Sequence, residues 1–300
     1  MNIFMAMKLV TYLIIYPLIL IISYLPFKLL YFLSDITYYL LYYVIRYRRK
    51  IVRFNLEISK VAKSKNDLVR IEKEFYRHIT DVFFEMFKFY GISSEEIKKR
   101  FYLENSEIID DLAKKKKNVM FMATHYGGFE WFLSIGHHVP HHPFAIYTPL
   151  TNKHLDSLVR KIRLKHGSKL ISRYETSNYI NKQIKEQKLF LYGMAADQSA
   201  QIRSITYWKH FLGVKVPVFT GSERIAKEHD IPVVFGKMVK IKRGYYKVVV
   251  EMISEFPRTY KDFDITDIYI DKVEKQIREN PEYYFWTHNR FKHKDKAPKG

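Results

Sequence analysis

The prediction of the fold starts from the stretch "FMATHYGGFEWF", Phe121 to Phe132. An apolar run ends at His125, two glycines follow, and Glu130 comes five residues after the histidine. In one continuous helix, residues five apart would be turned about 140° from each other and could not easily meet. Gly127 and Gly128 instead allow a tight turn, because glycine accepts backbone conformations that other residues avoid. The stretch therefore predicts a strand, a turn that brings Glu130 back towards His125, and a helix from about Phe129.

The same alternation continues along the chain. Apolar runs typical of strands alternate with segments of helical period, which favours an α/β fold with a mixed, mainly parallel central sheet flanked by helices. Ligands of such sheets collect beyond the carboxyl ends of the strands, where His125 is expected to lie. Strands are predicted at 118–123, 143–147, 188–195, 231–236 and 246–253, and helices at 66–91, 129–137, 152–166, 177–187, 221–229 and 266–279.

The N-terminal segment is strongly apolar. Between Lys8 and Lys28 lie nineteen residues without a charge, enough to cross most of a hydrocarbon core about 30 Å thick. A membrane helix over 9–27 is therefore expected, with a signal peptide and a buried hydrophobic hairpin as alternatives. Residues 29–45 contain Asp35 and six aromatic residues, so they are expected at the membrane interface or packed on the domain. Five basic residues between Arg46 and Arg53 predict that the rest of the chain stays on the cytoplasmic side.

Three regions are expected from this pattern. Residues 1–45 form a membrane-anchoring or interfacial segment, residues 46–295 form the main domain, and residues 296–300 form a disordered tail. The formal charge of +20 predicts attraction to polyanions, and net charge alone does not distinguish nucleic acid, an anionic membrane surface or an acidic protein.

The candidate catalytic residues are His125 and Glu130. A histidine oriented by a carboxylate can act as a general base on a hydroxyl or amine that attacks an acyl carbon. Asp197 and Gln198 follow another predicted strand and are expected to share the same edge of the sheet, where they could line an acceptor site or brace the histidine. The candidate substrate-binding residues are Arg163, Arg173, Asp197, Gln198 and Glu223, although the two arginines could be surface charges and Glu223 could simply stabilise a helix start.

Several chemistries lack their sequence signatures. The chain has no cysteine, no G-x-S-x-G elbow and no Walker or G-x-G-x-x-G loop, so a covalent acyl-enzyme and nucleotide chemistry are not expected. The run "HHVPHH", His137 to His142, has ligand-like spacing, but Pro140 and Pro143 interrupt a helix there. We therefore expect a solvated loop, no metal and no cofactor.

Several segments together resemble the late acyltransferases of lipid A biosynthesis, the lauroyl and myristoyl transferase family. The resemblance covers nearly the whole chain, and its most specific part is the last. In order, it is carried by "FNLEIS", "EFYRHITDVFFEMFK", "THYGGFEW", "YTPLTNKHLDSLVRKIRLKHG", "ADQS", "FLGVKVPVFTGSERIAKEHDIPVV" and "NPEYYFWTHNRFKH".

The resemblance implies a glycerol-phosphate-acyltransferase-like fold and an inner-membrane enzyme acting at the cytoplasmic face. Its donor would be acyl carrier protein, its acceptor a hydroxyl of a lipid A precursor, and its catalytic pair would fall on His125 and Glu130. Family positions also fall on Arg163, Asp197, Gln198 and Glu223. Thr148 and the sequence "DQSA" depart from many family members near the presumed acceptor pocket, so another lysolipid or aminolipid acceptor remains an alternative.

Two functions from other classes compete with this interpretation. A non-catalytic, membrane-tethered protein could use its basic surface to hold a polyanion, and a hydrolase could release the acyl group to water. The acyl-transfer hypothesis expects a membrane lipid acceptor, an anionic membrane surface and no nucleic acid as partners.

Overall fold

A seven-stranded sheet, in the order β1–β9–β8–β2–β5–β3–β4, forms the centre of the molecule. Adjacent strands run parallel except for the antiparallel pair β8 and β9. This is a computed structural model, and it describes residues 3–186, 188–200, 205 and 207–297. The strands are β1 (Phe101–Glu104), β2 (Val119–Ala123), β3 (His142–Tyr147), β4 (Lys169–Ser172), β5 (Phe190–Ala195), β8 (Val233–Lys242) and β9 (Tyr245–Ser254), with a separate hairpin β6 (Trp208–Phe211) and β7 (Val214–Pro217).

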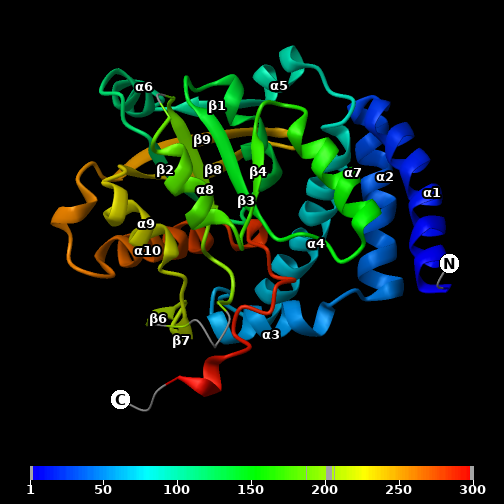
Figure 1. Ribbon diagram of the computed structural model, residues 1–300. Coiled ribbons are helices and arrows are strands. Elements are labelled where there is room, and N and C mark those ends of the chain that lie inside the picture. Colours follow the sequence, from blue (N-terminus) through cyan, green and yellow to red (C-terminus); the bar gives the residue numbers. More distant parts are fainter. Residues whose placement is uncertain (1–2, 187, 201–204, 206, 298–300) are drawn as a thin grey trace.

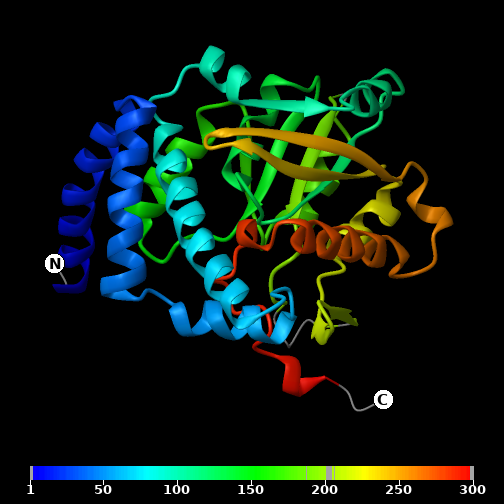
Figure 2. The ribbon, with the colours of Figure 1, turned by 180° about the vertical axis from the view of Figure 1, so that it is seen from behind.

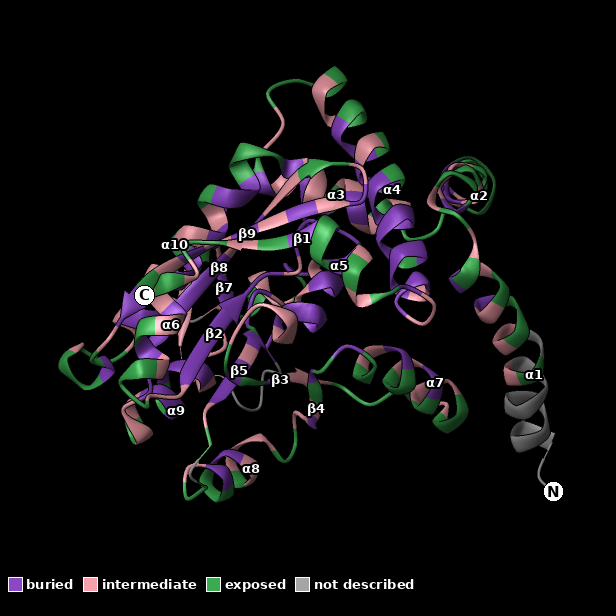
Figure 3. Ribbon diagram, turned by 90° about the horizontal axis from the view of Figure 1, so that it is seen from above, coloured by how far each residue is buried: buried purple, intermediate pink, exposed green. Residues whose placement is uncertain are grey.

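Helices cover both faces of the sheet. Figure 3 shows α9 and α10 on one side of the sheet and α4, α5 and α7 on the other. All five residues of β2 are buried, as expected for a central strand covered on both faces. The helices beyond the N-terminal region are α3 (Arg49–Ser59), α4 (Lys65–Lys88), α5 (Ser94–Arg100), α6 (Glu107–Lys114), α7 (Lys153–Leu164), α8 (Thr176–Gln183), α9 (Gly221–His229) and α10 (Asp264–Glu279), with the 3-10 helix η2 (Phe129–His137).

The predicted α/β class and the mainly parallel sheet are confirmed. All five predicted strands are present, and the segment after the glycine turn is helical, although it is a 3-10 helix. The sequence analysis missed β1 and β4, which have only four residues each and contain polar residues. It also missed the β6–β7 hairpin. Such short strands are stabilised by pairing with distant strands, so their own sequence carries little signal.

The N-terminal segment forms a pair of helices at one edge of the molecule. These are α1 (Ile3–Tyr24) and α2 (Phe27–Tyr39), and α2 continues into the π-helical turn η1 (Leu40–Ile45). Figures 1 and 2 show α1 outermost, with α4 between α2 and the sheet. The segment expected as one helix over 9–27 is divided, because α1 ends at Tyr24 and Pro26 precedes α2. No helix within the described residues is long and apolar enough to span a bilayer.

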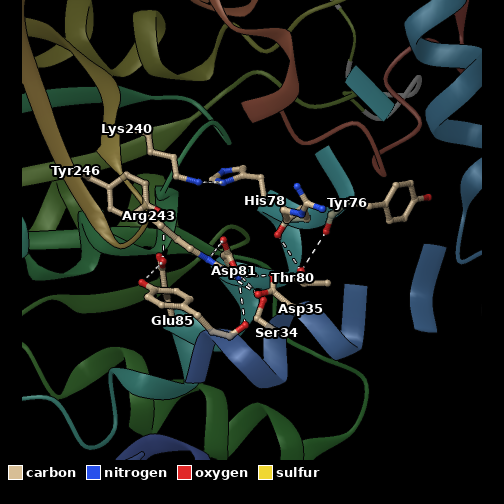
Figure 4. Close-up of polar contacts among 12 residues, drawn as sticks. Ser34, Asp35, Tyr76, His78, Thr80, Asp81, Glu85, Lys240, Arg243 and Tyr246 are labelled. Carbon is tan, nitrogen blue, oxygen red and sulfur yellow. Dashed lines mark hydrogen bonds and ion pairs between the residues drawn. The ribbon is translucent and has the colours of Figure 1, made fainter. Parts of the chain in front are cut away.

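A charged cluster fixes α2 to the main domain. We call Asp35, Asp81 and Arg243 the Arg243 cluster: the guanidinium donates to Asp35 on α2 at 2.8 Å and to Asp81 on α4 at 2.6 Å. Ser34 also donates to Asp81, at 2.7 Å. Figure 4 shows these side chains meeting between α2, α4 and the β8–β9 hairpin. The interaction of residues more than 160 positions apart holds the N-terminal helices in place.

The tail predicted for 296–300 lies partly outside the described residues. Lys296 ends a short 3-10 turn, Lys294–Lys296, and residues 298–300 are not described.

Candidate active site

The glycine turn after β2 forms as the sequence predicts. Gly127 has φ +56°, and a Cβ atom on Gly128 would come within 2.7 Å of the Tyr246 ring. The C-terminal segment is paired with the turn: Gly127 N–H donates to the carbonyl of Tyr283, and Phe285 N–H donates to that of His125. The "NPEYYFWTHNRFKH" motif thus packs directly against the candidate catalytic histidine.

His125 forms its hydrogen bond with Asp197. The imidazole Nδ1 lies 2.8 Å from Asp197 Oδ1, and the backbone N–H of His125 donates to Oδ2 at 3.2 Å. The expected pairing of His125 with Glu130 is therefore corrected, because a carboxylate from the neighbouring strand occupies Nδ1. Among the described residues, Nε2 of His125 has no hydrogen-bond partner, and the side chain is 27% exposed.

The register of the sheet brings these two residues together. β2 and β5 are adjacent and parallel, and Ala123 pairs with Ala195. His125 and Asp197 each lie two residues further on, so they leave the sheet side by side. The Tyr269 hydroxyl bridges the two strand ends, because it donates to the Ala123 carbonyl at 2.7 Å and accepts from Ala196 N–H at 3.2 Å. A rigid pair of strands thus positions the candidate base and its carboxylate.

The surroundings shift the pKa values of His125 and Asp197 in opposite directions. Burial would lower the pKa of His125, but the Asp197 carboxylate outweighs it, and Glu130 adds to the effect, so the pKa of His125 is raised. Burial would likewise raise the pKa of Asp197, but His125 and backbone N–H donors reverse this, so the pKa of Asp197 is lowered. An ionised Asp197 can stabilise the imidazolium that forms when His125 takes a proton.

Glu130 pairs with Arg163 instead. The Glu130 carboxylate receives hydrogen bonds from Nε of Arg163, at 3.1 Å, and from its Nη2. Glu130 is largely buried, and the opposed charge of Glu130 raises the pKa of Arg163 despite burial. This bidentate pair links η2 to α7 beside His125. Glu130 therefore acts on His125 through its charge and through Arg163, and it does not hold the imidazole directly.

A cavity of about 760 Å³ opens at His125. Its lining combines apolar side chains with basic ones, including Arg173, Arg224 and Lys292, of which the last two are exposed. His125, Glu130 and Arg163 also line the cavity. The apolar wall includes Phe121, Phe132, Phe144, Leu170 and Leu191. Such a cavity fits a ligand with a long apolar part and a polar or anionic part.

The structure separates the predicted substrate-binding residues into two groups. Arg163, Arg173 and Gln198 line the cavity, and Asp197 lies directly behind His125. Glu223 does not line it: its carboxylate accepts from Phe263 N–H at 2.7 Å and from Thr266 N–H at 2.9 Å. Glu223 thus stabilises the start of α10, and the expectation that it binds substrate is corrected.

His288 is a cavity residue that the sequence analysis did not single out. Its Nε2 accepts a hydrogen bond from Ser199 N–H at 3.0 Å, and burial lowers its pKa to about 4. His288 is therefore neutral at physiological pH and carries its proton on Nδ1. The only sequence signal was its place within the "NPEYYFWTHNRFKH" motif.

The histidines of "HHVPHH" lie at the end of η2, in the turn after it and at the start of β3. Within the described part of the chain, no group of three or more His, Cys, Asp or Glu side chains could hold a metal ion. The expectation of a solvated loop needs correction for His141, which is buried and whose Nε2 lies 3.0 Å from the Lys117 carbonyl. His142 is exposed.

Comparison with known proteins identifies the family. Residues 4–293 match the bacterial lipid A biosynthesis acyltransferase family, so the chain belongs to this family of acyltransferase enzymes. No curated protein sequence matches the chain. The family match covers both the N-terminal helices and the cavity residues.

Proposed function

We propose that this enzyme transfers a fatty acyl chain from acyl carrier protein to a hydroxyl of a lipid A precursor, with His125 as the general base. The observation that carries the proposal is the His125–Asp197 pair beside a cavity lined by apolar and basic side chains. The family match supports acyl transfer in lipid A biosynthesis. The donor, the acceptor hydroxyl and the residue roles are our inference.

The apolar interior would hold the fatty acyl chain, with the thioester carbonyl next to His125. Because Asp197 occupies Nδ1, Nε2 is left to take the proton from the acceptor hydroxyl. The hydroxyl oxygen then bonds to the acyl carbon, and the carbon–sulfur bond breaks as the tetrahedral intermediate collapses. The departing carrier thiolate takes up the proton from His125. No covalent acyl-enzyme is required, since the acceptor itself is the nucleophile.

The basic side chains of the cavity would receive the anionic parts of both substrates. Arg173, Arg224 and Lys292 come from three separate segments and all line the cavity. Phosphate groups of the acceptor and acidic side chains of the carrier protein are complementary to these cations. Part of the +20 charge would thus serve substrate binding.

Membrane association completes the proposal. Large apolar side chains are exposed along α1, α2 and η1, among them Leu18, Phe32 and Val44. Basic residues from Arg46 onward follow directly. Aromatic, apolar and basic side chains in this combination suit the interface of an anionic bilayer. We therefore place the enzyme on the cytoplasmic face of the bacterial inner membrane.

The test is acyl transfer by the His125→Ala variant. The substrates are acyl carrier protein with a labelled acyl chain and the lipid acceptor. We expect the rate of acyl transfer by the variant to fall by about 10²–10⁴-fold, the range for loss of a general base. His142→Ala, which removes an exposed histidine outside the cavity, should retain the wild-type rate. Wild-type transfer by His125→Ala would refute the assignment, and acyl release to water without any lipid product would indicate a hydrolase. Mass spectrometry of lipid A from cells lacking the protein should reveal the loss of one acyl chain.

A further inference from the structure

A second pocket, of about 300 Å³, lies where the end of α2 and η1 face α4. Its seven lining residues all differ from those of the active-site cavity. One wall is aromatic and the other is mainly basic, and we call it the tyrosine–arginine pocket. It is lined by Tyr38, Tyr39, Tyr43, Arg70, Lys73, Glu74 and Arg77.

Two of its three cations lack an ion pair within the part of the chain that the structure describes. Arg70 is paired with Asp67 at 2.7 Å and with Glu74 at 2.5 Å. Within the described residues, neither Lys73 nor Arg77 forms an ion pair, and the Arg77 guanidinium lies 5.1 Å from the centroid of the Tyr38 ring. Both side chains belong to exposed residues. The pocket therefore has a surplus of positive charge that an anion could neutralise.

Neighbouring contacts hold the two walls in position. Tyr38 lies one helical turn beyond Ser34, and Arg77 lies one turn before Asp81. Ser34 and Asp81 are hydrogen bonded, and the Arg243 cluster adds two ion pairs there (Figure 4). On the aromatic wall, the rings of Tyr39 and Tyr43 stack with centroids 5.8 Å apart. The pocket is thus formed before any ligand arrives, which reduces the entropic cost of binding.

The surroundings distinguish a lipid from a soluble anion. Exposed apolar residues lie close in sequence to the pocket tyrosines on α2 and η1, and we call them the apolar margin: Ile36 is 51% exposed, Val44 71% and Ile45 55%. The tyrosines themselves are amphipathic. Tyrosine rings beside basic groups are typical of the headgroup level of a bilayer. A soluble anion would need the cations but would gain nothing from the apolar margin.

We propose that the tyrosine–arginine pocket binds the phosphate-bearing headgroup of an anionic membrane lipid. Arg77 and Lys73 contact the phosphate, Tyr39 and Tyr43 lie at headgroup level, and the lipid chains lie along the apolar margin. The proposal rests on the membrane association included in the proposed function. It does not depend on the acyl-transfer chemistry.

Vesicle binding by the full-length protein tests this site. The vesicles contain phosphatidylcholine alone or an equal mixture with phosphatidylglycerol, and bound protein is measured by flotation. Each basic residue near an anionic surface raises the affinity for the membrane about fivefold. The Lys73→Ala/Arg77→Ala variant should therefore bind the mixed vesicles about 25-fold more weakly. The matched control, Lys98→Ala/Lys99→Ala, removes two exposed charges from α5 and should change binding less than about twofold. Equal losses in both variants would show that diffuse charge, and no particular pocket, attracts the membrane.

Soluble probes separate the possible ligands. Short-chain phosphatidylglycerol should bind the wild type more tightly than inorganic phosphate, and the double variant should lose this binding. Equal binding of inorganic phosphate, or preferential binding of an RNA oligonucleotide, would overturn the lipid assignment. Thermal melting checks that each variant is folded. The variant Lys73→Gln/Arg77→Gln provides a second double substitution that removes the same two charges.

The outcomes also separate this proposal from the proposed function. If the wild type bound neither kind of vesicle, membrane association itself would fail. If wild type and double variant bound the mixed vesicles equally well, only the headgroup site would fail. Acyl transfer by the wild type would remain a separate result in both cases.

Discussion

Two groups of interacting charges in this molecule use similar residues for different purposes. At the ends of β2 and β5, His125 and Asp197 are paired, and one imidazole nitrogen remains available beside the cavity. Beneath α2, the Arg243 cluster and the neighbouring Glu85 use their polar atoms to join separate elements of the fold. The first pair thus leaves a polar atom beside space for a ligand, whereas the second group uses its polar atoms within the fold. Titration of the first group should change the acyl-transfer rate. Titration of the second group should change the free energy of unfolding.

Among the residues that act through His125, Asp197 should give the largest effect, in the variant Asp197→Asn. An amide can no longer stabilise the imidazolium or fix the tautomer of His125, so the acyl-transfer rate should fall by about 10³–10⁴-fold. Because Asp197 raises the pKa of His125, the variant should lose its remaining activity at a lower pH than the wild type does. The measurement is kcat/KM as a function of pH, with thermal melting as the check of folding. An unchanged rate would remove Asp197 from the catalytic group.

The group beneath α2 predicts pH-dependent stability. Glu85 accepts hydrogen bonds from Trp131 Nε1 at 2.8 Å and from Tyr31 at 2.9 Å, and burial raises its pKa to about 7. Since this folded-state pKa exceeds the usual value of 4.5, the stabilising contribution is complete below about pH 4.5 and is lost as pH rises through about 7.

Glu85→Gln should remove this part of the pH dependence. The Glu85 contribution to the free energy of unfolding should decline by up to about 3 kcal/mol between pH 4.5 and pH 8 in the wild type. The variant, which cannot ionise at this position, should show a correspondingly flatter profile in urea denaturation. Parallel profiles for the two proteins would mean that Glu85 has an ordinary pKa.

A smaller effect is expected from Glu130→Gln. This variant leaves Arg163 without its ion-pair partner and removes a nearby negative charge, but the His125–Asp197 hydrogen bond remains. We expect the rate to fall by about 10–100-fold, less than for Asp197→Asn. The acid limb of the pH profile should also shift less, because Glu130 acts on His125 only through space. A greater loss than that of Asp197→Asn would restore Glu130 as the principal partner of the histidine.

Much of the fold could be predicted because its signals are local. The apolar runs, the helical periods and the glycine pair all depend on residues close together in the chain, and the corresponding strands, helices and turn are present. The four-residue strands β1 and β4 could not be recognised in this way. Their pairing with distant strands provides the hydrogen bonds that make them strands.

The sequence by itself determined that His125 follows a buried strand, that a glycine turn comes next, and that Asp197 follows another strand. Only the tertiary structure decided which carboxylate the histidine meets. Strand order places β5 beside β2, and the register aligns Ala195 with Ala123, so Asp197 reaches Nδ1 while Glu130 faces Arg163. The physical reason is that hydrogen-bond partners are set by distances across the sheet, which neighbouring positions in the sequence do not specify.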